Sequence, residues 1–308
     1  MKTLHVVTPF WYSQPISRAA GSAVWLKLEA FQPSGSFKAR GMGAACLAAK
    51  ENGATRIVCA SGGNAGYAVA YAGQQLDLDV TIIVPQTTPA RSKELIQGAG
   101  AQLLIHGQSW DDAYTYSLTL TQQTGAINIH PFDDPQVWHG HASLVQEIAD
   151  AGIKPGAIVL SVGGGGLLCG VAEGLHSMGW KDVPIVAVET VGASSFAQSV
   201  QADRLITLDR ITSIATTLGA RTVAQQALDW THHHPIVPWV ISDRTAVDAC
   251  LRFADDHRVL VEPACGAALA AGYFRAPALI ERDPVVIIVC GGVGVTRELL
   301  QKWDEQVK

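Results

Sequence analysis

The chain has 308 residues, of which 48% are hydrophobic and 16% charged, and its formal net charge at pH 7 is -5. This length suits two domains or one large one, and the composition supports a sizeable core, which excludes a disordered chain. The acidic balance argues against a nucleic-acid-binding surface spread over the protein, so we expect no nucleic-acid partner.

The cysteines and apolar runs indicate the compartment. Six cysteines, none in a Cys-x-x-Cys pair, argue against a disulfide framework and a zinc ribbon. The N-terminus has no apolar stretch long enough for a signal peptide. The most apolar runs, Ala157–Val162 and Val285–Cys290, fall short of the roughly 18–20 residues of a membrane span. We expect a cytoplasmic protein with reduced thiols and no membrane segment.

The first half of the chain alternates predicted helices and strands. Residues 36–52 are rich in Ala, Lys and Leu and stop at Gly53, which predicts a helix. The elements predicted after it are strand Arg56–Ala60, helix Ala65–Leu76, strand Val80–Val84, helix Pro89–Ala99, strand Gln102–His106, helix Ser109–Thr124 and strand Ala126–Ile129. Strands joined by crossover helices indicate a parallel sheet.

The second half repeats this pattern. The predicted elements are helix Ala142–Ala151, strand Ala157–Val162, helix Leu167–Met178, strand Val183–Val188, helices Thr245–His257 and Ala264–Phe274, and strand Val285–Val289. Apolar strands without alternation suit a sheet covered on both faces. The pattern predicts an α/β fold of two lobes, each an open, mostly parallel, twisted sheet flanked by helices.

A lysine opens the first predicted helix, directly after the turn Pro33-Ser34-Gly35-Ser36-Phe37. The helix dipole disfavours a cation at this end, which favours a neutral, nucleophilic amine at Lys38. The alternative is a solvated surface lysine.

A second loop, Ser61-Gly62-Gly63-Asn64-Ala65, joins a predicted strand to a helix at the carboxyl edge of the sheet. Successive backbone N–H groups in such a turn can hold an anion, for example a carboxylate. The alternative is an ordinary turn with an N-cap.

A third loop, Gly163-Gly164-Gly165-Gly166-Leu167, follows a buried strand. Four successive glycines cost backbone entropy, which is reasonable where a ligand must approach the backbone. The run matches neither a P-loop nor the dinucleotide fingerprint, so it predicts a cradle for a single phosphate. The alternative is a tight turn.

A fourth loop, Cys290-Gly291-Gly292, ends the last buried strand. Cys290 would point from the strand end towards whatever lies above the sheet. The alternative is a buried structural cysteine.

The four loops, in this order, resemble those of the tryptophan-synthase-β-like enzymes, the fold type II family that uses pyridoxal phosphate. The resemblance runs over essentially the whole chain and includes Val188-Glu189-Thr190 and residues 261–268. Within the family the chain is most similar to the L-serine/L-threonine dehydratases of the short type. We expect a discontinuous large domain of residues 1–34 and 137–308, a small domain of 35–136, and no regulatory domain.

The resemblance implies a role for each loop. Lys38 would form the Schiff base with the cofactor aldehyde, and Phe37 would pack on the pyridine ring. Asn64 would hydrogen-bond the ring hydroxyl oxygen, Cys290 would face the pyridine nitrogen, and Thr217 falls opposite the ring from Phe37. The glycine loop would bind the phosphate, and the loop at 61–65 would bind the substrate carboxylate.

Related dehydratases hold a monovalent cation beside the phosphate loop through an acidic side chain and carbonyl groups. The resemblance implies a similar site, for K⁺ or another monovalent cation. The residues that match the pattern are Gly163, Glu189, Ala193, Ser195, Leu218 and Ala220.

The implied activity is β-elimination in amino-acid catabolism, from L-serine to pyruvate and ammonia and from L-threonine to 2-oxobutyrate. Lys38 would be the general base at Cα. The alternatives are a β-replacement synthase of the cysteine-synthase type, a serine racemase, and a non-catalytic sensor on the same scaffold. The family norm implies a homodimer.

Overall fold

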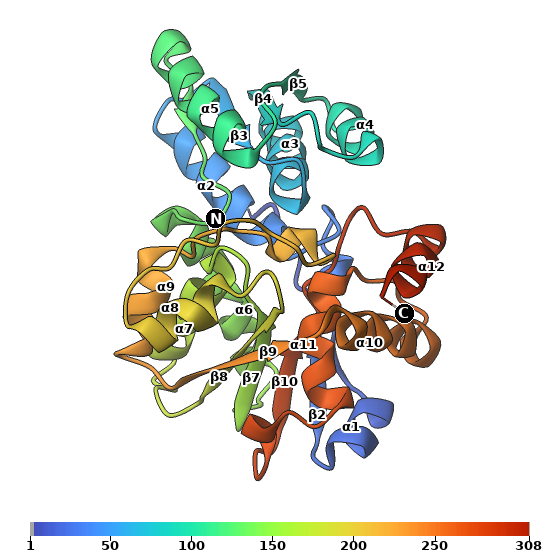
Figure 1. Cartoon of the computed structure of the whole chain (residues 1–308). Helices are drawn as coiled ribbons and strands as arrows, with labels where there is room; N and C mark the ends of the chain where they lie inside the picture. The colour runs from blue at the N-terminus through green and yellow to red at the C-terminus, as the bar shows by residue number, and fades with distance from the viewer. Residues whose placement is uncertain (1–2, 308) are drawn as a thin grey trace. The chain divides into compact units, whose positions relative to one another are not determined.

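The computed structural model describes residues 3–307 and divides the chain into two compact units (Figure 1). Unit 1 comprises Met1–Val6 and Gln32–His141, and unit 2 comprises Val7–Phe31 and Ala142–Lys308. Each unit is therefore built from two separate stretches of chain. The second stretch of unit 1 contains the whole of the small domain predicted over residues 35–136.

Unit 1 has a four-stranded sheet in the order β5-β4-β3-β6, with every pair parallel. Its elements are α2 (Lys38–Glu51), β3 (Arg56–Ala60), α3 (Asn64–Leu76), β4 (Asp79–Val84), α4 (Ala90–Gly98), β5 (Gln102–Ile105), α5 (Trp110–Thr124) and β6 (Ile127–Asn128). Helices α2 and α3 pack against each other, and α5 packs on β3 and β4. A capping box of Ser109 and Asp112 starts α5.

Unit 2 has a six-stranded sheet in the order β1-β2-β10-β7-β8-β9, parallel except for the β1–β2 pair. Its strands are β1 (Phe10–Tyr12), β2 (Val24–Lys27), β7 (Ala157–Ser161), β8 (Ile185–Thr190), β9 (Ile236–Ile241) and β10 (Val285–Ile288). Every residue of β7, β8 and β10 is buried. The apolar, non-alternating sequences of these strands fit this double cover.

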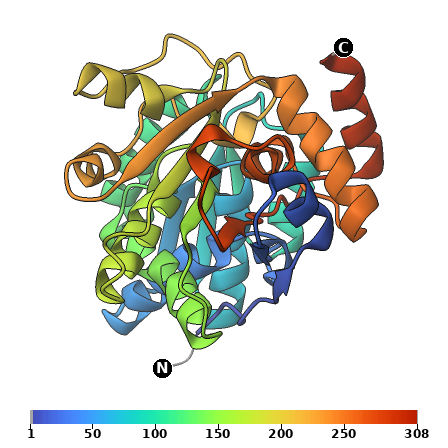
Figure 2. The ribbon, with the colours of Figure 1, turned by 90° about the horizontal axis from the view of Figure 1, so that it is seen from below.

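Helices surround this sheet. They are α1 (Gln14–Ala20), α7 (Gly166–Ser177), α8 (Ser195–Ala202), α9 (Gln225–Thr231), α10 (Asp243–His257), α11 (Pro263–Tyr273) and α12 (Arg297–Gln306), with short 3₁₀ turns η1 (Glu29–Phe31), η2 (Thr216–Leu218) and η3 (Pro277–Leu279). Helix α12 runs beside α10 (Figure 2), where Arg244 pairs with Asp304 at 2.7 Å. Helix α6 (Pro135–Asp150) begins in unit 1 and ends in unit 2.

The α/β class and the parallel sheets are confirmed. Most predicted elements differ from the observed ones by one or two residues at an end. Helix α6 begins seven residues before the predicted Ala142, because Asp134 caps its first turn by accepting from Gln136 N at 2.8 Å. Among residues 3–307, no helix has the length and apolar character to cross a membrane.

Candidate active site

Lys38 is the first residue of α2, as the sequence predicts. Its Nζ donates to the carbonyl oxygen of Pro131 at 2.5 Å and lies 5.1 Å from the centre of the Phe37 ring. No side chain caps this helix end. The amine thus lies near an N-terminus whose dipole disfavours its charged form, and the Pro131 carbonyl is its acceptor.

The turn before Lys38, and the His141 ring that packs on Phe37, contain buried polar atoms without partners. Ser34 Oγ, Ser36 Oγ and both ring nitrogens of His141 are buried and make no hydrogen bond. The His141 ring packs on Phe37 with ring centres 4.8 Å apart. Burial, and then the charge of Lys38, hold the pKa of His141 well below its usual range. Buried polar atoms are normally satisfied, so this region has bonding capacity for a ligand or water.

His130 shapes the loop that presents the Pro131 carbonyl. Its Nδ1 accepts from the backbone N–H of Phe132 at 3.3 Å and of Asp133 at 2.8 Å. Burial, and then the charge of Lys38, lower the pKa of His130 to about 4. The imidazole is therefore neutral near pH 7 and can serve as this acceptor.

The loop at 61–65 lies between β3 and α3, with Asn64 as the first residue of that helix. No side chain caps α3, and Ser61 Oγ accepts from Gly63 N at 3.4 Å. A Cβ on Gly62 would lie 2.6 Å from Cγ2 of Thr88, so glycine is required for this packing. Burial raises the pKa of Cys59 on β3 to about 12, and the charge of Lys38, a smaller effect, lowers it. We define the lysine site as Phe37, Lys38 and residues 61–65.

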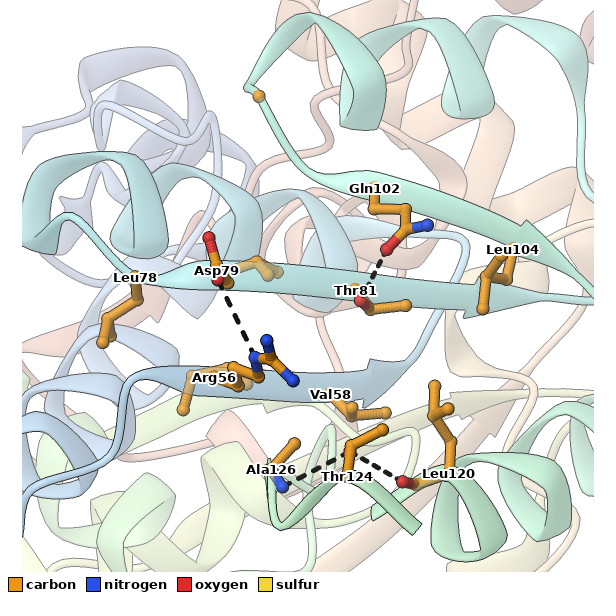
Figure 3. Close-up of a pocket in the computed structure, with 13 residues that line it drawn as sticks. Arg56, Val58, Leu78, Asp79, Thr81, Gln102, Leu104, Leu120, Thr124 and Ala126 are labelled. Atoms are coloured by element: carbon orange, nitrogen blue, oxygen red, sulfur yellow. Dashed lines mark hydrogen bonds and ion pairs between the residues drawn. The ribbon is translucent and has the colours of Figure 1, made fainter.

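A cavity of about 570 Å³ in unit 1 does not coincide with the lysine site. Its lining includes Arg56, Asp79 and Gln102, the first residues of β3, β4 and β5 (Figure 3). Arg56 and Asp79 are 3.9 Å apart and largely exposed. Ligands of parallel sheets bind at the carboxyl ends of strands, whereas this cavity lies at the amino ends. We assign it no function.

In unit 2 the glycine loop leads from β7 into α7. Gly165 is the N-cap, with a φ of 89°, and no side chain caps the helix. A Cβ on Gly165 would lie 2.6 Å from the Cβ of Ala227, and one on Gly163 would lie 3.1 Å from the Cα of Leu218. Any residue other than glycine would be strained at position 165. The loop leaves the first turn of a 12-residue helix open to an anion.

Cys290 follows β10 and is 6% exposed. The hydrogen bond with Cys265 and then burial raise the pKa of Cys290 well above its usual range, with smaller contributions from Glu262 and Cys250. The residue is therefore a neutral thiol at the end of a buried strand. We define the glycine-loop site as residues 163–167 and Cys290.

The predicted cation ligands lie on neighbouring segments of unit 2. The Glu189 carboxylate accepts from Phe196 N at 2.9 Å and from Ala197 N at 2.7 Å, so it also caps α8. Burial raises the pKa of Glu189 to about 7. Ser195 Oγ donates to the carbonyl of Ala220 at 3.0 Å. Among residues 3–307, no group of three or more His, Cys, Asp or Glu could hold a metal ion.

Residues 1–291 match the model of the family "Pyridoxal-phosphate dependent enzyme". The chain belongs to this family.

Two curated proteins resemble the chain along its length. It is 47% identical to the L-serine dehydratase/L-threonine deaminase of Mus musculus, covering 99% of this chain and 97% of that protein. The Homo sapiens protein of the same name is also 47% identical, covering 99% of this chain and 96% of that protein.

Two solved structures of the same fold also align. The fungal L-serine ammonia-lyase of Rhizomucor miehei has a TM-score of 0.94 and 36% identity, covering 100% of both chains. Maize serine racemase has a TM-score of 0.90 and 28% identity, covering 98% of this chain and 92% of that one. These neighbours agree with the fold type II architecture expected from the sequence.

The residues present fit pyridoxal phosphate. The glycine loop offers uncapped helix N–H groups where no Cβ could be placed at Gly165, which suits a phosphate group. The lysine site offers a primary amine beside Phe37 and beside unpartnered buried hydroxyls. Neither site contains a group whose chemistry conflicts with this cofactor.

The predicted residues of the lysine site lie in unit 1. Those of the glycine-loop site and the predicted cation ligands lie in unit 2. Sequence reasoning missed His130, Pro131 and His141 around the lysine, and Glu262 beside Cys290. Pro131 acts through its backbone carbonyl, which any residue type could supply. Glu262 lies in segment 261–268, but a Glu-Pro pair is typical of the start of a helix, so it did not indicate a contact near Cys290.

Proposed function

We propose that the protein is a pyridoxal-phosphate-dependent L-serine ammonia-lyase that converts L-serine to pyruvate and ammonia, and L-threonine to 2-oxobutyrate and ammonia. The observation that carries the proposal is the 47% identity, over 99% of the chain, to L-serine dehydratase/L-threonine deaminases. The lysine and glycine-loop sites support it, since they contain the amine and the anion cradle that the reaction requires.

Bound pyridoxal phosphate supplies an aldehyde that condenses with amines and a ring that withdraws electrons from the substrate Cα. Lys38 is the primary amine of the lysine site, so it would hold the cofactor covalently and then remove the Cα proton. The Pro131 carbonyl would accept a hydrogen bond from this amine whenever it is free and keep it in place.

The backbone N–H groups at 62–65 would bind the substrate carboxylate, because they open an uncapped helix of 13 residues. The glycine loop would hold the phosphate, and Cys290 would donate from its neutral thiol to the ring nitrogen. Once the Cα proton is removed, the β-hydroxyl leaves as water. Hydrolysis of the resulting enamine consumes one water and releases ammonia and the keto acid.

The cation site is the second part of the proposal. Glu189, the hydroxyl of Ser195 and the backbone at 163, 193, 218 and 220 would bind K⁺. One carboxylate with neutral oxygens is a donor set for a hard cation and not for a transition metal. The raised pKa of Glu189 supports this role, because a buried carboxylate without a counter-ion is costly.

We also propose a homodimer in the cytoplasm. Trp11, Tyr12 and Phe31 are 46%, 51% and 44% exposed around the edge strand β1, and exposed aromatic residues are enriched at interfaces. All six cysteines are free and buried, which suits a reducing compartment. Light scattering after size-exclusion chromatography would give a mass near 65 kDa for a dimer (twice about 32.6 kDa).

The test of the activity is to mix the purified, cofactor-loaded protein with L-serine and follow keto-acid release. Steady pyruvate formation without an added nucleophile is expected. The similarity to maize serine racemase favours racemisation as a second candidate, so D-serine is measured in the same samples. D-serine as the main product, or product formation only when a thiol is added, would overturn the proposed lyase.

A further inference from the structure

A buried carboxylate, Glu262, lies beside the thiol proposed to face the cofactor ring. Glu262 is the N-cap of α11 and is 8% exposed. Its Oε1 accepts from Thr217 Oγ1 at 2.9 Å. Burying a carboxylate is costly, which points to a specific task for this side chain.

The Glu262 residue also fixes the turn after Cys290. Its backbone N–H donates to the carbonyl of Gly291 at 3.4 Å. Gly292 has a φ of 143°, and a Cβ there would lie 2.7 Å from Cγ of Glu262 and 2.8 Å from its Cδ. Glycine is therefore required at 292 because the glutamate side chain occupies the space that any other side chain would need.

The thiols of Cys250, Cys265 and Cys290 form a cluster with Glu262. Cys265 of α11 hydrogen-bonds Cys290, and Cys250 of α10 donates to the backbone carbonyl of Glu262 at 3.3 Å. Cys250, Cys265 and Glu262 are the titratable groups that act on Cys290, and no cation is among them. The negative charge of Glu262 opposes ionisation of the Cys250 and Cys290 thiols.

We propose that Glu262 is a positioning residue: its carboxylate joins Thr217 and the Cys290–Gly292 turn into one wall of the glycine-loop site and places a negative charge beside the Cys290 thiol. The functional meaning rests on the proposed cofactor role of Cys290. A thiol kept neutral can donate a hydrogen bond to a ring nitrogen, whereas a thiolate would instead favour a protonated ring. Glu262 would thereby set the electron demand of the ring without touching the substrate.

The structural part can be tested without the cofactor. Cofactor-free protein is treated with iodoacetamide between pH 7 and 10, and labelling of each cysteine is followed by peptide mapping. In Glu262→Gln, which keeps an acceptor for Thr217 and the packing on Gly292, labelling of Cys290 should rise by up to about tenfold, the change that accompanies one unit of thiol pKa. Cys46 and Cys59 in unit 1 are the internal reference.

The matched control is Glu29→Gln. Glu29 is also a buried carboxylate of unit 2 that accepts a threonine hydroxyl, from Thr8 at 2.7 Å, but it is not among the groups that act on Cys290. This variant should leave Cys290 labelling unchanged. Less than a twofold rise in Glu262→Gln, or an equal rise at Cys46 and Cys59, would overturn the proposal.

The loaded enzyme gives the second readout. If Glu262 sets the state of Cys290, the alkaline limb of kcat and the pH-dependent absorbance change of the bound cofactor should both shift to lower pH in Glu262→Gln. The control variant should show neither shift. Changed labelling without keto-acid formation would refute the lyase and leave the Glu262 assignment standing, while lyase activity with unchanged labelling and pH profile would do the reverse.

Discussion

The two sheets differ in how completely they are covered. In unit 2 every residue of β7, β8 and β10 is buried, and the glycine loop and Cys290 follow β7 and β10 directly. In unit 1 the central strands β3 and β4 each begin with an exposed residue, Arg56 and Asp79. The unit with the less completely covered central strands contains the Lys38 amine, and the unit with the fully buried central strands contains the proposed anion and ring contacts. We expect the largest loss of turnover from substitution of Lys38 in unit 1, and a loss of cofactor affinity from substitution of the glycine loop in unit 2.

The largest effect is expected from Lys38→Ala. Loss of the amine removes both the covalent anchor and the general base, so keto-acid formation should fall by about 10³-fold or more. Lys93→Ala, in the same unit on a half-buried part of α4, should retain full activity. Turnover of Lys38→Ala within tenfold of the unsubstituted enzyme would assign the base to another residue.

Gly165→Ala tests the anchoring role of unit 2. Its Cβ would overlap Ala227 and Val223, so cofactor affinity should weaken by about ten- to a hundredfold in an equilibrium titration. Gly179→Ala is the control, since Gly179 has a similar φ of 71° but open space around it. Both variants should lose roughly 1–2 kcal/mol of stability to backbone strain. Equal cofactor affinity in the two would separate this loop from the phosphate.

Glu189→Gln tests the proposed cation site through the pH dependence of stability. The folded pKa of about 7 lies above the usual glutamate value of 4.5, so ionising Glu189 costs stability as pH rises from 4.5 through 7, and the cost is complete above pH 7. A bound K⁺ offsets this cost, so KCl should raise Tm by about 3 °C at pH 8 and not at pH 5. Tetramethylammonium chloride controls for ionic strength. In Glu189→Gln the KCl effect should vanish; its persistence would place the cation elsewhere.

The smallest effect concerns His130. His130→Leu removes the acceptor that shapes the Pro131 turn, and kcat should fall about fivefold, the value of one hydrogen bond, with cofactor affinity unchanged. His130→Asn retains an acceptor and should recover most of this loss. Because the folded pKa is lowered to about 4, His130 contributes stability above pH 6.5 that is lost as pH falls through 4. Between these values Tm should fall less steeply in His130→Asn than in the unsubstituted protein.

Sequence reasoning predicted what local chemistry determines. Strands β7 and β10 could be predicted because a strand buried on both faces accepts only apolar residues. The glycines after them could be recognised because a close approach to the backbone requires glycine. The unpredicted β9 contains Pro238, which suits only an edge strand and therefore masks the pattern. The antiparallel β1–β2 pair was also missed, since its alternation is short and rich in aromatic residues.

The candidate site residues also divide into those that a local motif predicts and those that it does not. The roles proposed for Lys38 and the glycine loop depend on local motifs, whereas the contacts of Glu262 with Thr217 and Gly292 join segments 45 and 30 residues apart in the chain. Nothing in the local sequence specifies such long-range pairs. A prediction from the chain alone therefore finds the reacting groups before it finds the residues that adjust them.

The enclosure of every native thiol leaves the outer surface of the enzyme free of sulfur nucleophiles. A single cysteine introduced at an exposed helical position, such as Glu94→Cys on α4, would then be the fastest-reacting thiol in the molecule. The protein could be tethered to a support or tagged with a dye at that one point, with all of its own cysteines left in place.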